Sequence, residues 1–315
     1  MLFNLATFVP GVTAIPAVQR KLLARRTGTG GTDSARYSYS VWLRHLVLAH
    51  ANGLPTTLDA IAELGPGDSL GMGLAALLSG ASRYFAFDVV AHANAERNLA
   101  VFDELVSLFR NRTPIPANDE FPRVSPRLDQ YAFPTHCLTD ARLDAALAPA
   151  RIDQIRAALR DCTSPGSVIQ YRAPWQGDQF IQRGSIDMIF SQAVLEHVDD
   201  LRGVYRASRL WLKPTGFISH QVDLKSHGTS VQWNGHWTYS DTVWKVIRGK
   251  DSWLINRAPC STHLRLLAEE GFRPVVEVRT SMPSSITRHD LARRFRDMPD
   301  EDLTTSGLFV QAVKA

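Results

Sequence analysis

The sequence predicts an α/β protein with a doubly wound, mostly parallel sheet, and two observations carry this prediction. Short apolar runs alternate with segments of helical periodicity along most of the 315 residues. A glycine turn at 65–67 directly follows the first apolar run and precedes a helical pattern. Strands that alternate with helices lie parallel in one sheet, with helices covering both of its faces. In such folds a strand, a glycine turn and the following helix together bind nucleotide-like ligands.

Seven apolar runs are predicted as strands, with helices in most of the intervals. The strands span 61–64, 83–88, 167–171, 185–190, 216–222, 272–278 and 308–313. The helices span 37–51, about 70–78, 96–109, 139–159, 199–212 and 262–270. In the helix after the glycine turn, Leu70, Leu74 and Leu77 recur on one face. Pro214 and Gly271 stop the last two helices.

The second and third strands are separated by far more chain than the roughly 30 residues of a whole strand–helix–strand unit. We therefore predict an insertion at about 111–150, in a main domain of residues 37–315. Residues 1–36 are predicted as an N-terminal arm and linker, with glycine-rich chain at 27–33 and room for an amphipathic helix at 15–26.

Composition narrows the class of protein. The content of 44% hydrophobic and 21% charged residues is that of a globular domain. The net charge of +4 permits an anionic partner, but the basic runs at 20–26 and 293–296 are typical of solvated helix faces. The three cysteines form no C-x-x-C pair, and the apolar N-terminus lacks a basic leader and contains Pro10 and Pro16. We expect a cytoplasmic protein without a transmembrane segment, as a monomer or a homodimer.

Four sequence phrases occur in the order of the predicted strands. They are Glu63–Gly67, Asp88 at the end of the second strand, Ser185–Val198 and Leu212–Phe217. Together they resemble the class I S-adenosylmethionine-dependent methyltransferases, over residues 57–315 without the insertion. The fourteen-residue phrase Ser185–Val198 is the most specific of these matches. The resemblance implies a Rossmann-like sheet of seven strands with the last antiparallel, and S-adenosyl-L-methionine as cofactor.

The resemblance also implies which residues bind the cofactor. They are Glu63, Gly65, Gly67, Asp88 and Ser191, with Tyr39 and Arg44 as candidates for its carboxylate. Asp88 corresponds to the family's ribose-binding acid, since a carboxylate accepts both ribose hydroxyls. Many members place an acid after the third strand to bind adenine, whereas this chain has Gln170–Trp175 there. Adenine is therefore held either by Asp178 or by Trp175 and the backbone.

Candidate catalytic residues follow the fourth and fifth strands. His197 begins the segment after the fourth strand, where it either acts on the acceptor or packs. His220, Asp223 and His227 leave the fifth strand, and three interpretations stay open for them. They form a base with an orienting carboxylate, they bind a divalent metal ion, or they are a polar loop without a role in catalysis.

A tryptophan-rich stretch follows at 231–253. Trp237 and Tyr239 either pack in a core or form a lid whose rings stack on a sugar. Asn256 and Arg257 come next and are predicted to bind an anionic group of the substrate. The segments 237–241, 256–257, 303–314 and 37–45 together resemble methyltransferases associated with bacterial polysaccharide biosynthesis.

The sequence thus predicts methyl transfer to a hydroxyl group of a small polar acceptor, a sugar or glycan precursor. A dinucleotide dehydrogenase fits less well, because Leu70 stands where its third glycine belongs. Two alternatives stay open. One is a nucleic-acid methyltransferase, although no nucleic-acid-binding module is recognisable. The other is a non-catalytic protein that binds the cofactor and serves as a partner of another enzyme.

Overall fold

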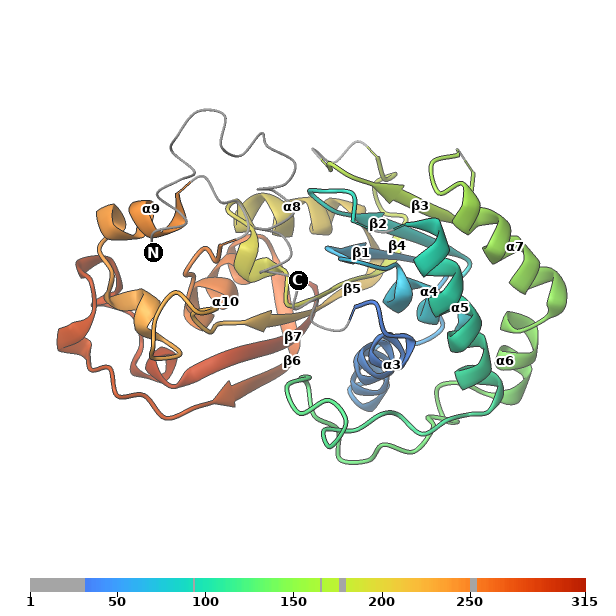
Figure 1. Ribbon diagram of the computed structural model, residues 1–315, viewed down its shortest axis with the longest axis horizontal. Coiled ribbons are helices and arrows are strands. Elements are labelled where there is room, and N and C mark those ends of the chain that lie inside the picture. Colours follow the sequence, from blue (N-terminus) through green and yellow to red (C-terminus); the bar gives the residue numbers. More distant parts are fainter. Residues whose placement is uncertain (1–31, 93, 165, 176–179, 250–253) are drawn as a thin grey trace.

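A seven-stranded sheet runs through the molecule in the order β3-β2-β1-β4-β5-β7-β6 (Figure 1). The computed structural model describes residues 32–315 except 93, 165, 176–179 and 250–253. The predicted helix at 15–26, Asp178 and Trp253 lie outside the described residues. The strands are β1 Ala60–Leu64, β2 Arg83–Phe87, β3 Ile169–Arg172, β4 Ile186–Gln192, β5 Leu212–Asp223, β6 Phe272–Ser281 and β7 Thr305–Lys314.

The strand directions confirm the predicted fold. Strands β1 to β5 pair in parallel, whereas β7 is antiparallel to both of its neighbours, β5 and β6. From β1 the chain builds outward through β2 to β3, and it then returns to the other side of β1 with β4. Ligands of open α/β sheets bind at such a switch point, beyond the carboxyl ends of the strands.

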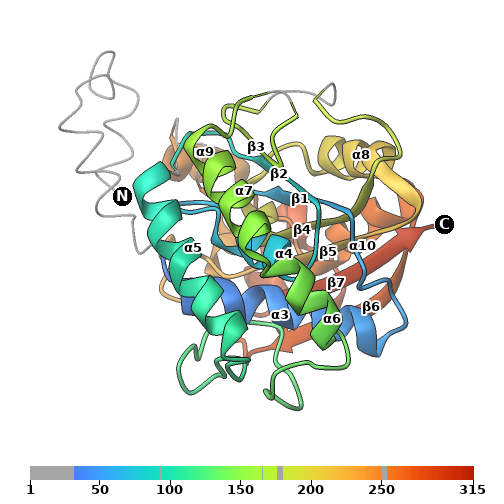
Figure 2. The same ribbon diagram turned by 90° about the vertical axis from the view of Figure 1, so that its right-hand side faces the viewer.

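Helices cover both faces of the sheet. They are α3 Ala35–Ala51, α4 Gly71–Leu78, α5 Ala95–Arg110, α6 Asp140–Ala146, α7 Pro149–Arg160, α8 Leu201–Trp211, α9 Asp241–Arg248 and α10 Cys260–Glu269. One hydrophobic cluster joins α3, α4, α5 and α7 to one face, and a second joins α8 and α10 to the other. Figure 2 shows α5 and α7 running side by side near β3. No helix within the described ranges is long and apolar enough to cross a membrane.

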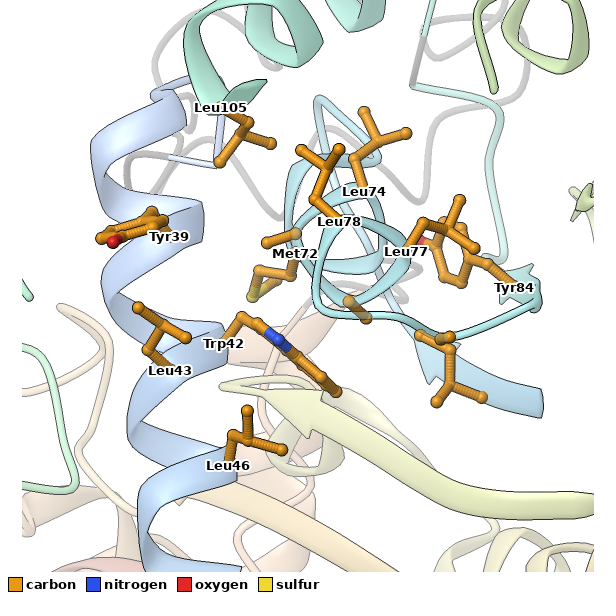
Figure 3. Packing of buried hydrophobic residues seen from close by; sticks show 14 of the residues in the cluster. Tyr39, Trp42, Leu43, Leu46, Met72, Leu74, Leu77, Leu78, Tyr84 and Leu105 are labelled. Carbon is orange, nitrogen blue, oxygen red and sulfur yellow. The ribbon is translucent and has the colours of Figure 1, made fainter. Parts of the chain in front are cut away.

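The packing of α3 on α4 forms the centre of the larger cluster (Figure 3). Trp42 of α3 is buried, and its indole N–H donates to Ser79 Oγ at 2.8 Å. In the first turn of α4, Gly73 leaves room for the ring of Tyr84 on β2, because a Cβ on Gly73 would lie 2.0 Å from Tyr84 Cζ. The tyrosine hydroxyl then reaches the carboxylate of Glu63 on β1.

Two predicted elements differ from the structure at prolines. The helix predicted at 139–159 is two helices, because Pro149 starts α7 at its first turn and cannot continue α6. The fifth strand begins at Leu212 rather than at 216. Its pairing with β4 jumps from Leu212 to Phe217, so exposed Pro214 lies in an irregularity where no ladder N–H is needed.

The segment 111–138 of the predicted insertion packs along α3 (Figure 1). Arg44 of α3 is buried, and its guanidinium donates to the carbonyl oxygens of Pro116, Val124 and Pro126 at 2.8–3.1 Å. Tyr39 donates to the carbonyl of Thr113 at 2.6 Å. These side chains therefore attach the inserted segment to the domain.

Gly73→Ala tests the contact between α4 and β2. Alanine is normally the better helix former by about 0.8–1 kcal/mol, so propensity alone predicts stabilisation. We expect destabilisation of about 1–3 kcal/mol instead, because the new methyl group must displace the buried ring of Tyr84. The free energy of unfolding in urea measures this difference, and an increase relative to the wild type would contradict the packing described.

Candidate active site

The glycine turn between β1 and α4 has the left-handed backbone that glycine adopts without strain. The φ angles are +65° at Gly65 and +75° at Gly67. A Cβ on Gly65 would lie 2.6 Å from a methyl group of Val194, in the loop after β4. The turn and this loop are therefore in direct contact, with no space for a side chain between them.

Asp88, directly after β2, lies beside the glycine turn. Its Oδ2 accepts the N–H of Gly67 at 3.3 Å, and its Oδ1 accepts the N–H of Val89 at 2.7 Å. Burial raises the pKa of this carboxyl group, although backbone N–H donors oppose the shift. The long contact to Gly67 leaves Oδ2 with capacity to accept a hydroxyl from a ligand.

The backbone of Trp175, predicted to bind adenine, lies next to Asp88. Its backbone N–H donates to the Asp88 carbonyl at 2.8 Å. Its half-buried indole packs against Phe87 and Trp211, with ring centroids 5.5 and 5.6 Å away. The side chain thus lies on the edge of the apolar cluster beneath β2.

Glu63 lies inside the protein rather than at the surface of the turn. It is fully buried on β1, where the Tyr84 hydroxyl donates to it. Burial raises the pKa of Glu63 to about 8, against the lowering effect of the hydrogen bonds from Tyr84 and Gly73. Its position indicates a structural role under the N-terminus of α4.

Tyr39 and Arg44, predicted to bind the cofactor carboxylate, make their hydrogen bonds elsewhere. Both are buried, and their described acceptors are Ser40 of α3 and residues of the segment 111–138. Tyr39 and Arg44 therefore hold the inserted segment, and we do not propose that they bind the cofactor.

The structure separates His220 from Asp223 and His227, which were predicted to act with it. His220 is fully buried and pairs with Ser191 of β4, with Nδ1 2.8 Å from Ser191 Oγ. Its ring lies against Tyr205 of α8, with 6.3 Å between the ring centroids, on the face of the sheet that α8 and α10 cover. Burial lowers its pKa to about 3. The prediction that His220 acts with Asp223 is wrong, because the two side chains are three residues apart on a strand and face opposite sides.

Asp223 and His227 do come together, as predicted. His227 Nε2 lies 3.4 Å from Asp223 Oδ2. Burial disfavours the charge of Asp223, but the hydrogen bond from His227 and the charge of Lys225 outweigh it and lower the pKa to about 2. The rings of His227 and His197 are in edge contact, 5.1 Å between centroids. These residues lie beyond the carboxyl ends of β4 and β5.

Two further residues join this group, which we call the acceptor-side cluster. It consists of Glu196, His197, Asp223, His227 and His236. Glu196 is 3% exposed, and neither carboxylate oxygen makes a hydrogen bond of normal geometry with a described residue, although the backbone N–H groups of Glu196 and Asp223 lie nearby. Burial, with the nearby charge of Asp223, raises its pKa well above the ordinary value. Burial and the Arg257 charge lower the pKa of His236 to about 3.

Sequence reasoning missed Glu196 and His236. The signal for Glu196 was its place beside His197 in the fourth-strand phrase, at the carboxyl end of a central strand. His236 stands among the aromatic residues of 231–253, where no spacing distinguishes it from a packed side chain.

Asn256 fixes the turn that carries Glu196 and His197. Its side-chain amide donates to the carbonyls of Leu195 at 2.8 Å and Val198 at 2.7 Å. Its backbone N–H donates to the Glu196 carbonyl at 2.6 Å. Asn256 was predicted to bind substrate, and the structure instead gives it a positioning role.

The tryptophan-rich stretch forms small cores in the structure. Trp237 is fully buried and donates its indole N–H to the Arg257 carbonyl at 3.0 Å. Tyr239 is half-buried and donates to the Thr229 carbonyl at 3.2 Å. Of the two interpretations left open, core packing therefore describes Trp237, whose ring has no exposed face for a sugar.

Arg257 is also directed inward. Its guanidinium lies over the rings of Trp244 and Phe295, at 4.8 and 5.0 Å, and donates to Asp241 Oδ1 at 2.6 Å. The residue is 2% exposed. The prediction that it binds an anion of the substrate is corrected, because protein groups occupy its charge.

Backbone strain is concentrated around the acceptor-side cluster. Among the described residues other than glycine, four have positive φ, and three of these are Ala193, His227 and Arg257. Ala193 starts the loop after β4, and His227 belongs to the cluster itself. Strained backbone of this kind costs about 1–3 kcal/mol at each residue and is found mainly at functional sites.

Comparison with known proteins finds similar folds. No protein-family model matches the sequence, and no curated protein matches it. The structure is similar to an S-adenosylmethionine-dependent methyltransferase from Mesorhizobium loti, with 16% identity, 84% of this chain and 95% of that chain covered, and a TM-score of 0.41. It is similar to geranyl diphosphate C-methyltransferase from Streptomyces coelicolor, with 13% identity, coverage of 87% and 78%, and a TM-score of 0.42. The strand order and the antiparallel β7 are those of the Rossmann-like methyltransferase fold.

Glu63 makes the stability of the protein depend on pH. Its pKa rises from 4.5 to about 8 on folding, so the folded state takes up a proton. This contribution to stability is complete below pH 4.5 and is lost as the pH rises toward 8. From pH 5 to 8 we expect the wild type to lose up to about 1.4 kcal/mol per pH unit relative to Glu63→Gln. Urea unfolding of both proteins measures this loss, and parallel pH profiles would show that Glu63 does not titrate in this range.

Proposed function

We propose that the protein transfers a methyl group from S-adenosyl-L-methionine to a hydroxyl group of a small polar acceptor. One observation carries the proposal. The glycine turn and Asp88 lie at the sheet's switch point, in contact through Gly65 and Val194 with the loop that leads to Glu196 and His197. A cofactor site and a group of acid–base residues are thus joined at one edge of the sheet.

The cofactor half of the proposal rests on the geometry of Asp88. A ribose diol fits a buried carboxylate whose remaining acceptor sites face the glycine turn. Gly65 and Gly67 give the turn its left-handed backbone, at positions where a side chain would meet Val194 and Thr32, and the backbone N–H of Trp175 bonds the Asp88 carbonyl. The bound cofactor supplies an electrophilic methyl group on its sulfonium sulfur.

The acceptor half rests on the acceptor-side cluster. A hydroxyl acceptor must lose its proton as it is methylated, and imidazole and carboxylate groups are the side chains that assist such a step. Asp223 orients the imidazole of His227, and Asn256 holds the turn that carries Glu196 and His197. This polar, hydrogen-bonding surface favours a polar acceptor. We propose a sugar or glycan precursor, as in polysaccharide biosynthesis.

Gly67→Ala tests the cofactor site. We expect S-adenosylhomocysteine to bind at least tenfold more weakly, because alanine is strained at a φ of +75° and its Cβ would lie 3.1 Å from Thr32 Oγ1, which shifts the turn that contacts Asp88. Isothermal titration calorimetry measures the affinity. Gly184→Ala is the matched control, since Gly184 also has a positive φ of +68° but lies away from the turn with open space around it. An equal loss of affinity in both variants would indicate general strain and contradict the assignment.

The same titration separates the alternative functions. Binding of a nicotinamide dinucleotide in place of S-adenosylhomocysteine would overturn the proposal. Salt-dependent binding of RNA would support a nucleic-acid acceptor instead. Tight cofactor binding without turnover on a panel of sugars and nucleotide sugars would favour the non-catalytic partner.

His227→Asn tests the acceptor side. We expect kcat to fall by about 10²-fold or more, because the group that assists deprotonation of the acceptor is lost. The affinity for S-adenosylhomocysteine is expected to stay within twofold of the wild type. His289→Asn is the control, since His289 is exposed and lies outside the cluster. Unchanged kcat in His227→Asn would remove this residue from the mechanism.

A further inference from the structure

Two groups of three metal-ligating side chains occur in the part of the chain that the structure describes. One contains Glu196, His197 and His227, and the other contains His50, His136 and Cys137. The ligand atoms within each group lie within 4.8 Å of one another. The first group belongs to the acceptor-side cluster and includes a buried carboxylate that makes no hydrogen bond of normal geometry with a described residue.

We propose that Glu196, His197 and His227 bind one divalent transition-metal ion and that this ion receives the acceptor oxygen. The inference rests on the proposed function and specifies how the acceptor hydroxyl is activated: His227 assists deprotonation as a ligand of the ion and not as the base itself. Ligands at about 2.0–2.2 Å from an ion are at most about 4.4 Å apart. The observed limit of 4.8 Å therefore requires only small side-chain movements to close the site around an ion.

The unpartnered carboxylate is the strongest argument. Glu196 exposes 3% of its surface, and neither oxygen makes a hydrogen bond of normal geometry with a described residue. The backbone N–H groups of Glu196 and Asp223 lie near enough only to oppose in part the rise in its pKa that burial causes. A buried carboxylate without a donor costs several kcal/mol in its charged form. A divalent ion about 2 Å from the Glu196 carboxylate would remove this cost. Bulk water cannot do so, because the group is buried.

The surroundings hold the ligands as metal sites require. Asp223 lies 3.4 Å from Nε2 of His227, so it can orient that imidazole and leave Nδ1 for the ion. Asn256 fixes the turn of Glu196 and His197 through two hydrogen bonds to its carbonyl oxygens. A carboxylate–histidine pair and a clamped ligand-bearing turn both reduce the entropy lost when an ion binds.

The ligand set indicates the type of ion. Two imidazoles and one carboxylate favour borderline ions such as Co²⁺ or Zn²⁺ over Mg²⁺ or Ca²⁺, which prefer oxygen alone; Mn²⁺ binds such sites more weakly and serves as the paramagnetic probe. Three protein ligands leave at least one coordination position open for the acceptor hydroxyl.

The ion would lower the pKa of that hydroxyl and release its proton to solvent. The oxygen then forms a bond to the methyl carbon while the carbon–sulfur bond breaks, and its electron pair stays on sulfur. The products are the methyl ether, S-adenosylhomocysteine and one proton, so atoms and charge balance.

The second group fits an ion less well. Its two histidines, His50 and His136, are both exposed, and its one buried member is the Cys137 thiol rather than a carboxylate. This group nevertheless provides a matched control, because removing His136 disables it and leaves the acceptor-side cluster intact.

The test uses the full-length protein, stripped with chelator and titrated with Mn²⁺ by calorimetry and electron paramagnetic resonance. We expect one site in the wild type, and at least tenfold weaker binding in Glu196→Gln. His136→Asn is expected to bind Mn²⁺ like the wild type. Glu196→Gln keeps the side-chain shape and cannot ionise, so it should fold. Mn²⁺ should raise the melting temperature of the wild type and not that of Glu196→Gln.

S-adenosylhomocysteine binding is measured on the same samples, so that the two proposals fail separately. Absence of Mn²⁺ binding with intact S-adenosylhomocysteine binding would overturn the metal site alone. Absence of S-adenosylhomocysteine binding in the wild type would overturn the proposed function. Mn²⁺ binding that survives Glu196→Gln but is lost in His136→Asn would place the ion in the other group and overturn this inference.

Discussion

The contact between Gly65 and Val194 is the constraint on which the candidate site depends. With only 2.6 Å between a Cβ at Gly65 and the valine methyl group, the glycine turn and the loop after β4 touch with no room for a side chain. The turn carries the proposed cofactor site, and the loop leads directly to Glu196 and His197. Because both segments leave adjacent parallel strands, this single contact sets how far a bound cofactor lies from the acceptor-side cluster.

Polar groups that are buried at the carboxyl ends of the strands divide into two kinds. Glu63 and His220 each bond a protein partner through one atom, Tyr84 and Ser191 respectively, while Glu63 Oε1 and His220 Nε2 have no described partner. Neither oxygen of Glu196 makes a hydrogen bond of normal geometry with a described residue, although a buried unpaired carboxyl costs free energy that folding must offset elsewhere. Such a cost is maintained where a ligand satisfies the group, which is why the structure points to the acceptor side of the site.

The fold could be predicted from the sequence because its signals are local. Apolar runs, the glycine turn and Asp88 each depend on a few neighbouring residues, and the strands predicted from them are present. The site was less accessible for two physical reasons. His220 and Asp223 point to opposite faces because side chains alternate along β5, and the prediction that they act together overlooked this alternation. The contacts of Arg44 and Arg257 are made with groups that are distant in the sequence. Arg44 donates to the carbonyl of Pro126, and Arg257 lies over the ring of Trp244, and residue spacing does not predict either contact.

The central claim is that the glycine turn and the acceptor-side cluster form one active site. The crystal structure of the complex with S-adenosylhomocysteine tests it most directly. We expect the ribose hydroxyls to contact Asp88 and the sulfur to face Glu196 and His227 across an open space for the acceptor. A ligand bound away from Asp88, or one whose sulfur points away from the acceptor-side cluster, would contradict it.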